Sequence, residues 1–514
     1  MWDGKVAFAL IFAVLAGAVV GRLVAARYRK RVLALMSQGA PPSDAGAPAA
    51  ALPQQSRRAR TSSITQNRRA RGRLALTIVA ISLAIGLTQS WWSLQFVYNE
   101  TGYGPIKLAL LGLAFAWVTV PALGQLWRWS WLRIALASTA YVACVGALVW
   151  LRSTGEQSPA TVAFWLLGTI ATPLIAFGLA ASGRARAIGP YLLPLFLIMA
   201  GASVVGTDLL QGLMASETAT QRLAPVVGAF GAWTTIGVFA LAPWLLLAWP
   251  SWRLARALAR GYEAKRFSEP LYLMGSYWLV ALLVDALAAS HGIGAWSLTV
   301  IGCWLWIPLG MRLASGWLAP PAEPPNLLVL RVFRRDAQVQ ALFDSVVERW
   351  RYSGTASLIA GTDLALNTLE PDELFAFLNG RLRNRFIAGG DDLARQLAAI
   401  DVAPDPDGRF RVADFYCFDS TWKLALAALV ARADVVLMDL RGLVAGNAGC
   451  LHELGVLAQA GHLQRVVLLF DTQTDRAAAN AAIGAGSPRF DWFDAGALDS
   501  AAAEAVLGRL VEAR

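Results

Sequence analysis

The sequence predicts a multi-pass α-helical membrane domain followed by a cytosolic α/β domain with a doubly wound, mostly parallel sheet. Three observations predict this division. Hydrophobic residues make up 56% of the 514 residues and charged residues only 15%, a balance typical of membrane proteins. Nine apolar runs of about membrane-spanning length precede residue 318. After residue 326, strand-like and helix-like patterns alternate over about 190 residues, as in open parallel sheets.

The first apolar run, residues 6–20, follows a single lysine and is itself followed by five basic residues. A cleavable signal peptide has the opposite order, so residues 1–31 are predicted to be an N-terminal transmembrane anchor with its amino end outside. Residues 32–73 are rich in Pro, Ala, Ser and Arg. Because such a segment cannot form a packed core, we expect a disordered, basic cytoplasmic linker that touches anionic lipid headgroups.

The remaining apolar runs predict an eight-helix transmembrane domain over residues 74–317. The predicted spans are at about residues 74–95, 108–126, 134–151, 161–181, 191–213, 223–249, 271–289 and 293–317. With nine spans, 21 basic residues fall on one side of the membrane and four on the other. The positive-inside rule therefore predicts a protein of the cell's inner (plasma) membrane whose C-terminal domain is cytoplasmic.

The distribution of charge excludes nucleic acid as a partner. Before residue 326 there are 26 Lys and Arg against 10 Asp and Glu, whereas the rest has 19 against 24. The net charge of +11 therefore belongs to the membrane part, where it sets topology. Four Cys without a CxxC pair and only three His predict reduced thiols and no metal site.

Two carboxylates fall within the predicted spans. Asp208 and Asp285 both lie near the outer ends of their helices. Intramembrane acids often belong to a binding site, so an outward-facing polar pocket for a small ligand is one interpretation. The other is that both carboxylates reach interfacial water or pair within the helix bundle.

A Pro-rich linker, residues 318–326, separates the membrane part from an α/β domain over residues 327–514. Strands are expected at residues 327–333, 357–360, 410–416, 434–440 and 465–470, with a last one around Phe490 and Trp492. Helices are expected at residues 336–351, 370–386, 391–400, 421–431 and 499–511, and between Asn447 and Gly461. Asn447 is expected to cap its helix, and Asp419 or Ser420 the helix at 421–431.

Glu453 is the candidate catalytic residue. No GxGxxG, P-loop or HExxH motif is present, so dinucleotide reduction, P-loop hydrolysis and zincin chemistry have no support. Glu453 falls in the second turn of the helix after the central strand at 434–440, near the sheet edge where ligands of parallel sheets bind. The alternative is an ordinary glutamate stabilised by the helix dipole. Cys450 is interpreted as a small packed residue.

Three segments resemble the TIR (Toll/interleukin-1 receptor) family. ADVVLMDLRGLVAGNAGCLHEL resembles its strand, loop and W-C-x-x-E-L helix, FYCFDSTWKLALAALVARAD its second strand and following helix, and LLVLRVF its first strand. Gly449 replaces the Trp of the motif, and residues 355–408 look like a long insertion. The nucleoside 2-deoxyribosyltransferase-like proteins are a neighbouring match, with a catalytic Glu at the corresponding position.

The resemblance implies a flavodoxin-like, TIR-like sheet and an activity. Enzymatic TIR domains are NAD glycohydrolases, and the glutamate of this motif is their essential residue. By resemblance, this role would fall on Glu453. NAD or a related nucleotide would then be the substrate, and no cofactor is expected. Residues expected to bind the substrate at the strand ends are Arg334, Asp419, Trp422, Arg441 and Gly442. Arg334 or Arg441 would hold a pyrophosphate, and Trp422 would stack a base.

Three functions remain open from the sequence. The first is a membrane-tethered TIR-like enzyme that hydrolyses the N-glycosidic bond of NAD or a related nucleotide in signalling or defence. The second is a non-catalytic signalling module that forms homo-oligomers through the cytosolic domain. The third is a transporter or sensor with a cytosolic regulatory domain. Glu453 paired with Arg334 or Asp419 in a cleft would favour the first, and an occluded Glu453 the second. A cavity that meets Asp208 and Asp285 would favour the third.

Overall fold

The computed structural model describes residues 4–38, 63–152, 158–166, 170, 174–175, 189–320, 323–332, 336–361, 371–400, 402–484 and 488–512. The chain forms two compact units. The helical unit comprises Met1–Ala25 and Ala75–Leu313, and the sheet unit comprises Ala26–Leu74 and Ala314–Arg514. The sheet unit therefore contains the C-terminal end of the first long helix and the N-terminal end of the second, as well as the C-terminal domain.

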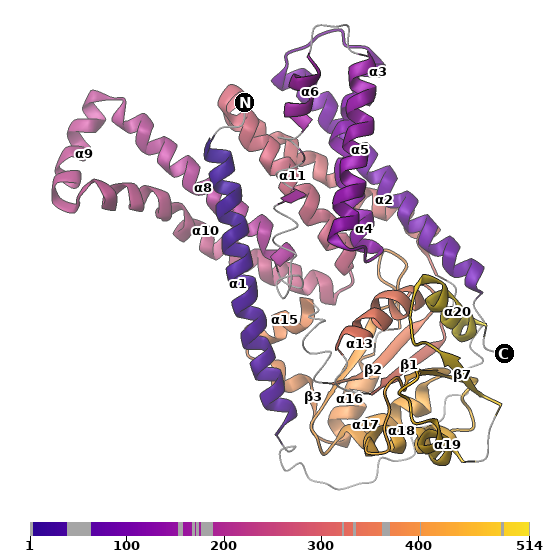
Figure 1. Ribbon diagram of the computed structural model, residues 1–514. Coiled ribbons are helices and arrows are strands. Elements are labelled where there is room, and N and C mark those ends of the chain that lie inside the picture. Colours follow the sequence, from indigo (N-terminus) through magenta and orange to yellow (C-terminus); the bar gives the residue numbers. More distant parts are fainter. Residues whose placement is uncertain are drawn as a thin grey trace. The chain divides into compact units, whose positions relative to one another are not determined.

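The described residues of the first part of the chain form helices joined by short loops and turns (Figure 1). The helices are α1 (Gly4–Met36), α2 (Ile64–Trp92), α3 (Pro105–Phe115), α4 (Thr119–Leu126), α5 (Trp131–Arg152), α6 (Pro159–Leu166), α8 (Gly189–Met214), α9 (Glu217–Phe230), α10 (Ala232–Glu263), α11 (Glu269–Ile293) and α12 (Trp306–Leu318), with short segments η1 (Ser93–Val97), η2 (Ala116–Val118) and η5 (Gly294–Leu305). Eight helical stretches among the described residues are long and apolar enough to cross a membrane.

These eight stretches overlap eight of the nine predicted spans. The other predicted span, residues 161–181, lies mostly outside the described residues, so the odd number of spans remains a prediction. The predicted span at 223–249 is wrong at its start, because Gly231, with φ of +83°, separates α9 from α10. Positive φ is a conformation that glycine adopts without strain, so the chain turns there.

Glycines allow close approach within the helical unit. A Cβ added to Gly86 on α2 would lie 2.3 Å from the carbonyl oxygen of Gly112 on α3. A Cβ added to Gly206 on α8 would lie 2.1 Å from the carbonyl oxygen of Phe239 on α10. Small residues at helix crossings let backbones pack directly, which is the usual basis of association between membrane helices.

The sheet unit is built on seven parallel strands in the order β3-β4-β2-β1-β5-β6-β7. The strands are β1 (Asn326–Arg331), β2 (Thr355–Ala360), β3 (Phe386–Ile387), β4 (Val412–Cys417), β5 (Val435–Asp439), β6 (Arg465–Phe470) and β7 (Phe490–Asp494). Without the two-residue β3, the order in sequence numbering is 3-2-1-4-5-6, that of doubly wound dinucleotide-binding sheets. The predicted parallel α/β sheet is therefore confirmed.

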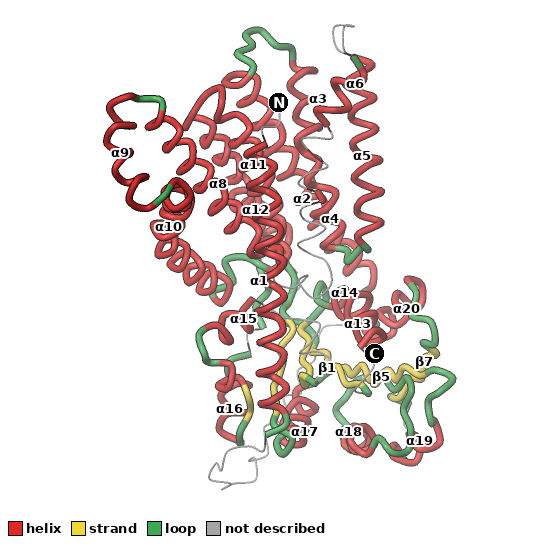
Figure 2. Tube along the Cα trace, turned by 60° about the vertical axis from the view of Figure 1, so that its left-hand side comes forward, coloured by secondary structure: helices red, strands yellow, loops and turns green. Residues whose placement is uncertain are grey.

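Helices cover both faces of the sheet (Figure 2). They are α13 (Asp336–Leu342), η6 (Phe343–Val347), α14 (Glu348–Trp350), α15 (Pro371–Leu378), η8 (Leu382–Arg385), α16 (Gly390–Ala398), α17 (Trp422–Arg432), α18 (Ala448–Gln459), α19 (Arg476–Ile483) and α20 (Ser500–Val511). Leu327 and Val329 share a core with α13–α14, α20 and the end of α1. Leu328 and Leu330 share the other core with α16–α19. The alternation along β1 thus builds two apolar layers.

Three local expectations in this unit are wrong. The helix expected at 370–386 ends at Leu378, because the chain turns at Gly380, with φ of +69°, and β3 follows. Asn447 makes no side-chain cap to α18; its Oδ1 accepts from the Val444 backbone N–H instead. Neither Asp419 nor Ser420 caps α17, whose N-cap position is Thr421.

The position of β2 also differs from the resemblance. The segment FYCFDST, which resembles the second TIR strand, forms β4. β2, with the sequence TASLIA and fully buried, pairs with β1 on one side and β4 on the other. On the side of β1 away from β5, the neighbouring strand is therefore β2, which lies within residues 355–408, the segment interpreted as an insertion.

The ends of α1 and α2 contribute to the sheet unit. Tyr28, Val32 and Leu35 of α1 are buried in one of its two cores. The Tyr28 hydroxyl donates to Glu373 at 3.3 Å and lies 3.2 Å from the hydroxyl of Tyr416. The disordered linker expected at 32–73 is therefore wrong at both ends, because residues 32–36 and 64–73 are helical; residues 39–62 lie outside the described residues.

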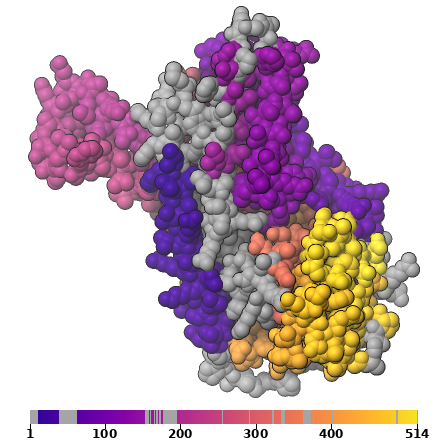
Figure 3. Space-filling model, in the orientation of Figure 1, coloured from indigo at the N-terminus to yellow at the C-terminus, as the bar shows by residue number. Residues whose placement is uncertain are grey.

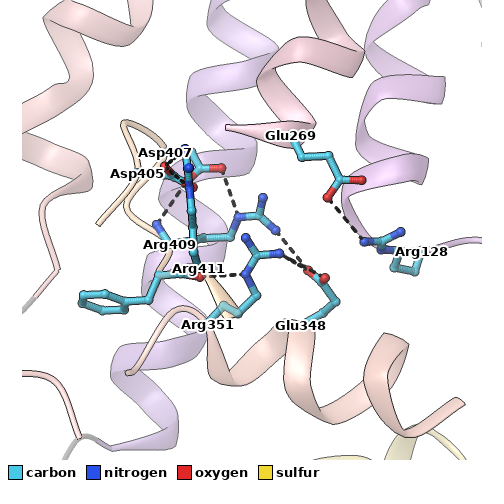
Figure 4. Close-up of polar contacts among 9 residues, drawn as sticks. Arg128, Glu269, Glu348, Arg351, Asp405, Asp407, Arg409 and Arg411 are labelled. Atoms are coloured by element: carbon cyan, nitrogen blue, oxygen red, sulfur yellow. Dashed lines mark hydrogen bonds and ion pairs between the residues drawn. The ribbon is translucent and has the colours of Figure 1, made fainter. Parts of the chain in front are cut away.

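Ion pairs lie before the first residues of β2 and β4, at the amino edge of the sheet (Figure 4). Arg409, 2% exposed, pairs with Asp407 at 3.0 Å and with Glu348 at 3.1 Å. Arg351 pairs with the same Glu348 at 3.1 Å and donates to the Phe410 carbonyl at 2.7 Å. Buried charges need such partners because desolvation of an unpaired charge is costly. This network fixes the edge opposite to Glu453.

Candidate functional site

The candidate site lies at the carboxyl ends of β1 and β5. From β1 the chain moves to β2 and β4 on one side, and it returns to β5 on the other side of β1. Open parallel sheets bind ligands outside the carboxyl ends of the strands at such a reversal of strand order. The last residues of the two strands, Arg331 and Asp439, are register partners. Both side chains are buried.

Glu453 is placed here by α18. The helix presents Cys450, Glu453, Leu454 and Leu457 toward the sheet, at the spacing of one helical face. The Cys450 thiol donates to the Arg331 carbonyl oxygen at 3.8 Å, so the first turn of α18 packs on the end of β1. Glu453 is only 3% exposed. In the described part of the chain, its Oε2 has no hydrogen-bond partner.

The protonation of Glu453 follows from this environment. Burial raises the pKa of its carboxyl to about 8, and the nearby Arg331 guanidinium opposes the rise. Desolvation disfavours the charged form, and one cation does not fully compensate for it. At neutral pH the carboxyl is therefore mostly protonated. A group of this kind ionises readily when further positive charge comes close to it.

The remaining charges at this edge are paired with each other. The Arg441 guanidinium donates to Asp439 through Nε at 2.8 Å and through Nη2 at 2.6 Å, and also to the Gln338 carbonyl at 3.2 Å. Gly442, with φ of +70°, donates its N–H to Asp471 at 2.9 Å. These bonds fix the loop after β5 and connect it to the loop after β6. They also occupy the guanidinium that was expected to hold a pyrophosphate.

The other predicted residues are distributed differently. Arg334 lies outside the described residues. Asp419 is exposed at the turn after β4. Trp422 is half-buried at the start of α17, where its ring contacts that of His452 edge-on, with centroids 5.6 Å apart. Trp422 thus packs against α18, the helix that carries Glu453.

The structure brings Arg331, which the sequence interpretation missed, close to the carboxylate of Glu453. One signal was available, since Arg331 is the only charged residue in the apolar run LLVLRVF. A charged side chain that a buried strand retains usually has a partner. Its partner could not be identified without the register of β1 against β5.

Thiol and metal chemistry have little support at this edge. Burial raises the pKa of the Cys450 thiol to about 12, so it stays protonated and is a poor nucleophile. Among the described residues there is no group of three or more His, Cys, Asp or Glu side chains that could hold a metal ion. The carboxyl of Glu453 remains the candidate reactive group of the site.

The two acids predicted in the helical unit lie on different helices. Asp285 on α11 accepts a hydrogen bond from Gln89 Nε2 on α2 at 2.5 Å, and Asp208 lies on α8. Gln89 is 2% exposed. A pairing within the bundle, one of the two interpretations of Asp285, is thus present.

A scan against family models finds no match for the chain. Searches of curated proteins and of solved structures find no similar protein either. The resemblance to TIR domains therefore rests on the sequence motifs alone.

Proposed function

We propose that the sheet unit is a membrane-tethered, TIR-like domain that hydrolyses the N-glycosidic bond of NAD or a related nucleotide, with Glu453 as the catalytic residue. The helical unit anchors it in the plasma membrane, with the amino end outside and the sheet unit in the cytoplasm, as the distribution of basic residues favours. The observation that carries the proposal is the buried Glu453 carboxyl, whose Oε2 has no hydrogen-bond partner among the described residues. It lies at the edge where parallel sheets of this kind bind nucleotides.

The strand order supports the fold that the proposal requires. The strands β2-β1-β5-β6-β7 follow the 2-1-3-4-5 order of flavodoxin-like sheets, and β4 adds one strand beyond β2. In both common orders of doubly wound sheets, the ligand lies at the reversal next to the first strand. Glu453 is on the helix that follows β5, one of the two strands at that reversal.

The reaction would use the ionised carboxylate. The C1′–N bond breaks, its electron pair goes to the nicotinamide ring nitrogen, and an oxocarbenium-like ribose remains. The carboxylate stabilises this positive charge in a dry site. Water then adds to C1′ and gives its proton to the carboxylate, so ADP-ribose and nicotinamide are the products. Because the nicotinamide ring is cationic in NAD, its binding would itself favour ionisation of Glu453.

The residues around Glu453 suggest separate roles. Arg331 would hold Glu453 in place and lower its pKa. Trp422, half-buried beside α18, would stack a base or the nicotinamide ring. Arg441 is engaged by Asp439, so its role would be to fix the loop after β5 rather than to bind a phosphate. Arg334 and Asp419 remain candidates for contacts with the substrate.

One observation favours the alternative function. A Glu453 that is 3% exposed is occluded, as expected for a non-catalytic module that signals or assembles with further copies of the chain. Catalysis then requires that the loops at this edge open to admit the nucleotide, as lids do in many enzymes. The enzymatic function predicts nicotinamide release from NAD, and the non-catalytic function predicts none.

The test is nicotinamide release from NAD by the full-length chain in nanodiscs. The full chain is needed because a fragment that begins at residue 326 would lose Tyr28, Val32 and Leu35 from the core. We expect release by the wild type and a loss of at least a hundredfold in Glu453→Gln, which keeps the size of the side chain but cannot carry the charge. Glu512→Gln, at an exposed position of the same unit, is the matched control.

Two results would overturn the proposal. Release of nicotinamide by Glu453→Gln at the wild-type rate would remove Glu453 from the reaction. No release by the wild type, even when many copies are crowded on one vesicle, would favour the non-catalytic module. An unfolding midpoint that is no lower than that of the wild type in either variant shows that lost activity does not come from unfolding.

A further inference from the structure

Helix α10 (Ala232–Glu263) carries exposed tryptophans at two levels. Trp233 is 86% exposed near its start, and Trp249 and Trp252 are 61% and 52% exposed further along. At about 1.5 Å per residue, 16 to 19 residues of helix span roughly 24–29 Å. The hydrocarbon core of a bilayer is about 30 Å thick, and tryptophans gather at its two interfaces. The tryptophans of α10 therefore mark both interfaces.

The surface between these levels is suited to lipid tails. Apart from Thr234 next to Trp233, its exposed side chains are apolar, and the large ones are Ile236, Val238, Leu241, Leu245 and Leu246. From Ala232 to Trp252 the helix contains no charged residue. In Figure 1 α10 lies beside α8, with α9 at their tip, and Figure 3 shows this arm in pink. The side of α10 that faces away from α8 is thus a lipid-facing surface.

Arginines occur at only one of the two levels. Arg253 lies over the ring of Trp249 at 4.6 Å, and Arg256 lies over the ring of Trp252 at 3.6 Å. Arg260 follows one turn later, and all three arginines are exposed. These spacings of three, four and seven residues put the pairs on one face of the helix. The only acid in α10 is Glu263, its last residue.

We propose that Arg253, Arg256 and Arg260 with Trp249 and Trp252 form a binding surface for the phosphate headgroups of anionic phospholipids. A guanidinium stacked on an indole keeps its N–H edges free, and these edges can hold a phosphate in bidentate fashion. Stacking also limits the rotamers of the arginine, so less entropy is lost when the phosphate binds. Three positive charges at the depth of the headgroups match a leaflet rich in anionic lipid.

The test is native mass spectrometry of the full-length chain released from nanodiscs of phosphatidylcholine and phosphatidylglycerol. The variant Arg253→Gln/Arg256→Gln should retain fewer phosphatidylglycerol molecules than the wild type, with affinity lower by about fivefold for each arginine removed. Arg253→Lys/Arg256→Lys keeps the charge and should recover part of the retention. Arg152→Gln/Arg222→Gln removes two exposed arginines elsewhere in the helical unit and is the matched control.

Equal retention by the α10 variant and the control would overturn the proposal. The same holds if the wild type retains the two lipids in the proportion of the bilayer, because the surface then has no preference for anionic headgroups. If the wild type forms dimers that only the α10 variant loses, a second copy covers this surface and the proposal is also wrong. The unfolding midpoint of each variant establishes that the chain is folded.

Discussion

The protonation of Glu453 couples the site to the stability of the sheet unit. Its pKa is about 8 in the folded chain and near the ordinary 4.5 when unfolded. Because the pKa of Glu453 is higher in the folded chain than in the unfolded chain, its contribution to stability is fully present below about pH 4.5. This contribution is lost as the pH rises through 8. Glu453→Gln cannot ionise. It should therefore stabilise the protein at pH 8, on the order of 2–4 kcal/mol, and much less at pH 5.

The measurement is the unfolding midpoint of wild type and variant in nanodiscs from pH 5 to pH 9. The two midpoints should diverge as the pH rises. Glu512→Gln, which is exposed, should follow the wild type at every pH. A constant difference between Glu453→Gln and wild type across this range would show that the carboxyl is not held neutral in the folded state.

Arg409 is the central cation of the ion-pair network at the amino edge. Arg409→Ala leaves Asp407 and Glu348 buried with fewer partners. Removal of one member of a buried ion pair typically costs about 3–5 kcal/mol. We expect a loss of this size in denaturant unfolding, and under about 1 kcal/mol for Arg395→Ala, whose pair with Asp392 is exposed. Equal losses would contradict the structural role assigned to the network.

The place of an individual residue could be predicted from the sequence where a pattern of apolar residues located it. The position of Glu453 after a central strand followed from the order of apolar runs and helical spacing. Its burial and its neighbour Arg331 did not, because they depend on the register of β1 against β5. The pairing of Arg441 with Asp439 is a local contact of residues i and i+2, but its burial depends on α18 and the loop after β6. Because the sequence showed only the charge of Arg441 and not its buried partner, Arg441 was predicted to bind a phosphate.

At the scale of elements, the C-terminal end of α1 is part of the sheet unit. Leu35, 1% exposed, packs in the core with residues of α20 and the sheet. Leu35→Ala should destabilise the sheet unit by about 2–5 kcal/mol through the cavity it leaves. Hydrogen exchange of α20 and β6 measures this loss, since amides in a core exchange through unfolding of their unit.

The matched control is Leu15→Ala on the same helix. Leu15 is 61% exposed, so its truncation removes little packing within the chain. We expect the amides of α20 and β6 to exchange at the wild-type rate in this variant. Faster exchange in Leu15→Ala than in Leu35→Ala would contradict the assignment of α1 to this core.

The strands of the sheet unit were predictable because they are short apolar runs bounded by turn residues. β1, β2, β4, β5, β6 and β7 all overlap the expected ranges. β3 was missed because two residues carry no periodicity, and because the expected helix continued past Leu378 through the turn at Gly380. The first turns of α2 were missed because their arginines are typical of a solvated linker. In the structure, Asn67 donates a hydrogen bond to Ser353, and Arg68 forms an ion pair with Glu504.

At the scale of the whole molecule, the membrane and sheet parts were predictable from composition alone. The boundary between them was not, because α1 and α2 each contribute residues to both units. A division by sequence assigns these helix ends to an anchor and a linker, whereas packing assigns them to the core of the C-terminal domain.

The pH dependence of nicotinamide release by the full-length chain in nanodiscs tests the central claim most directly. In the proposed reaction the carboxylate form of Glu453 is the active form, and the pKa of this group is about 8 in the free protein. The account predicts that kcat/KM for NAD rises with pH and reaches a plateau above about pH 8, and that Glu453→Gln abolishes this rise. Turnover that is independent of pH, or a rise that persists in Glu453→Gln, would contradict it.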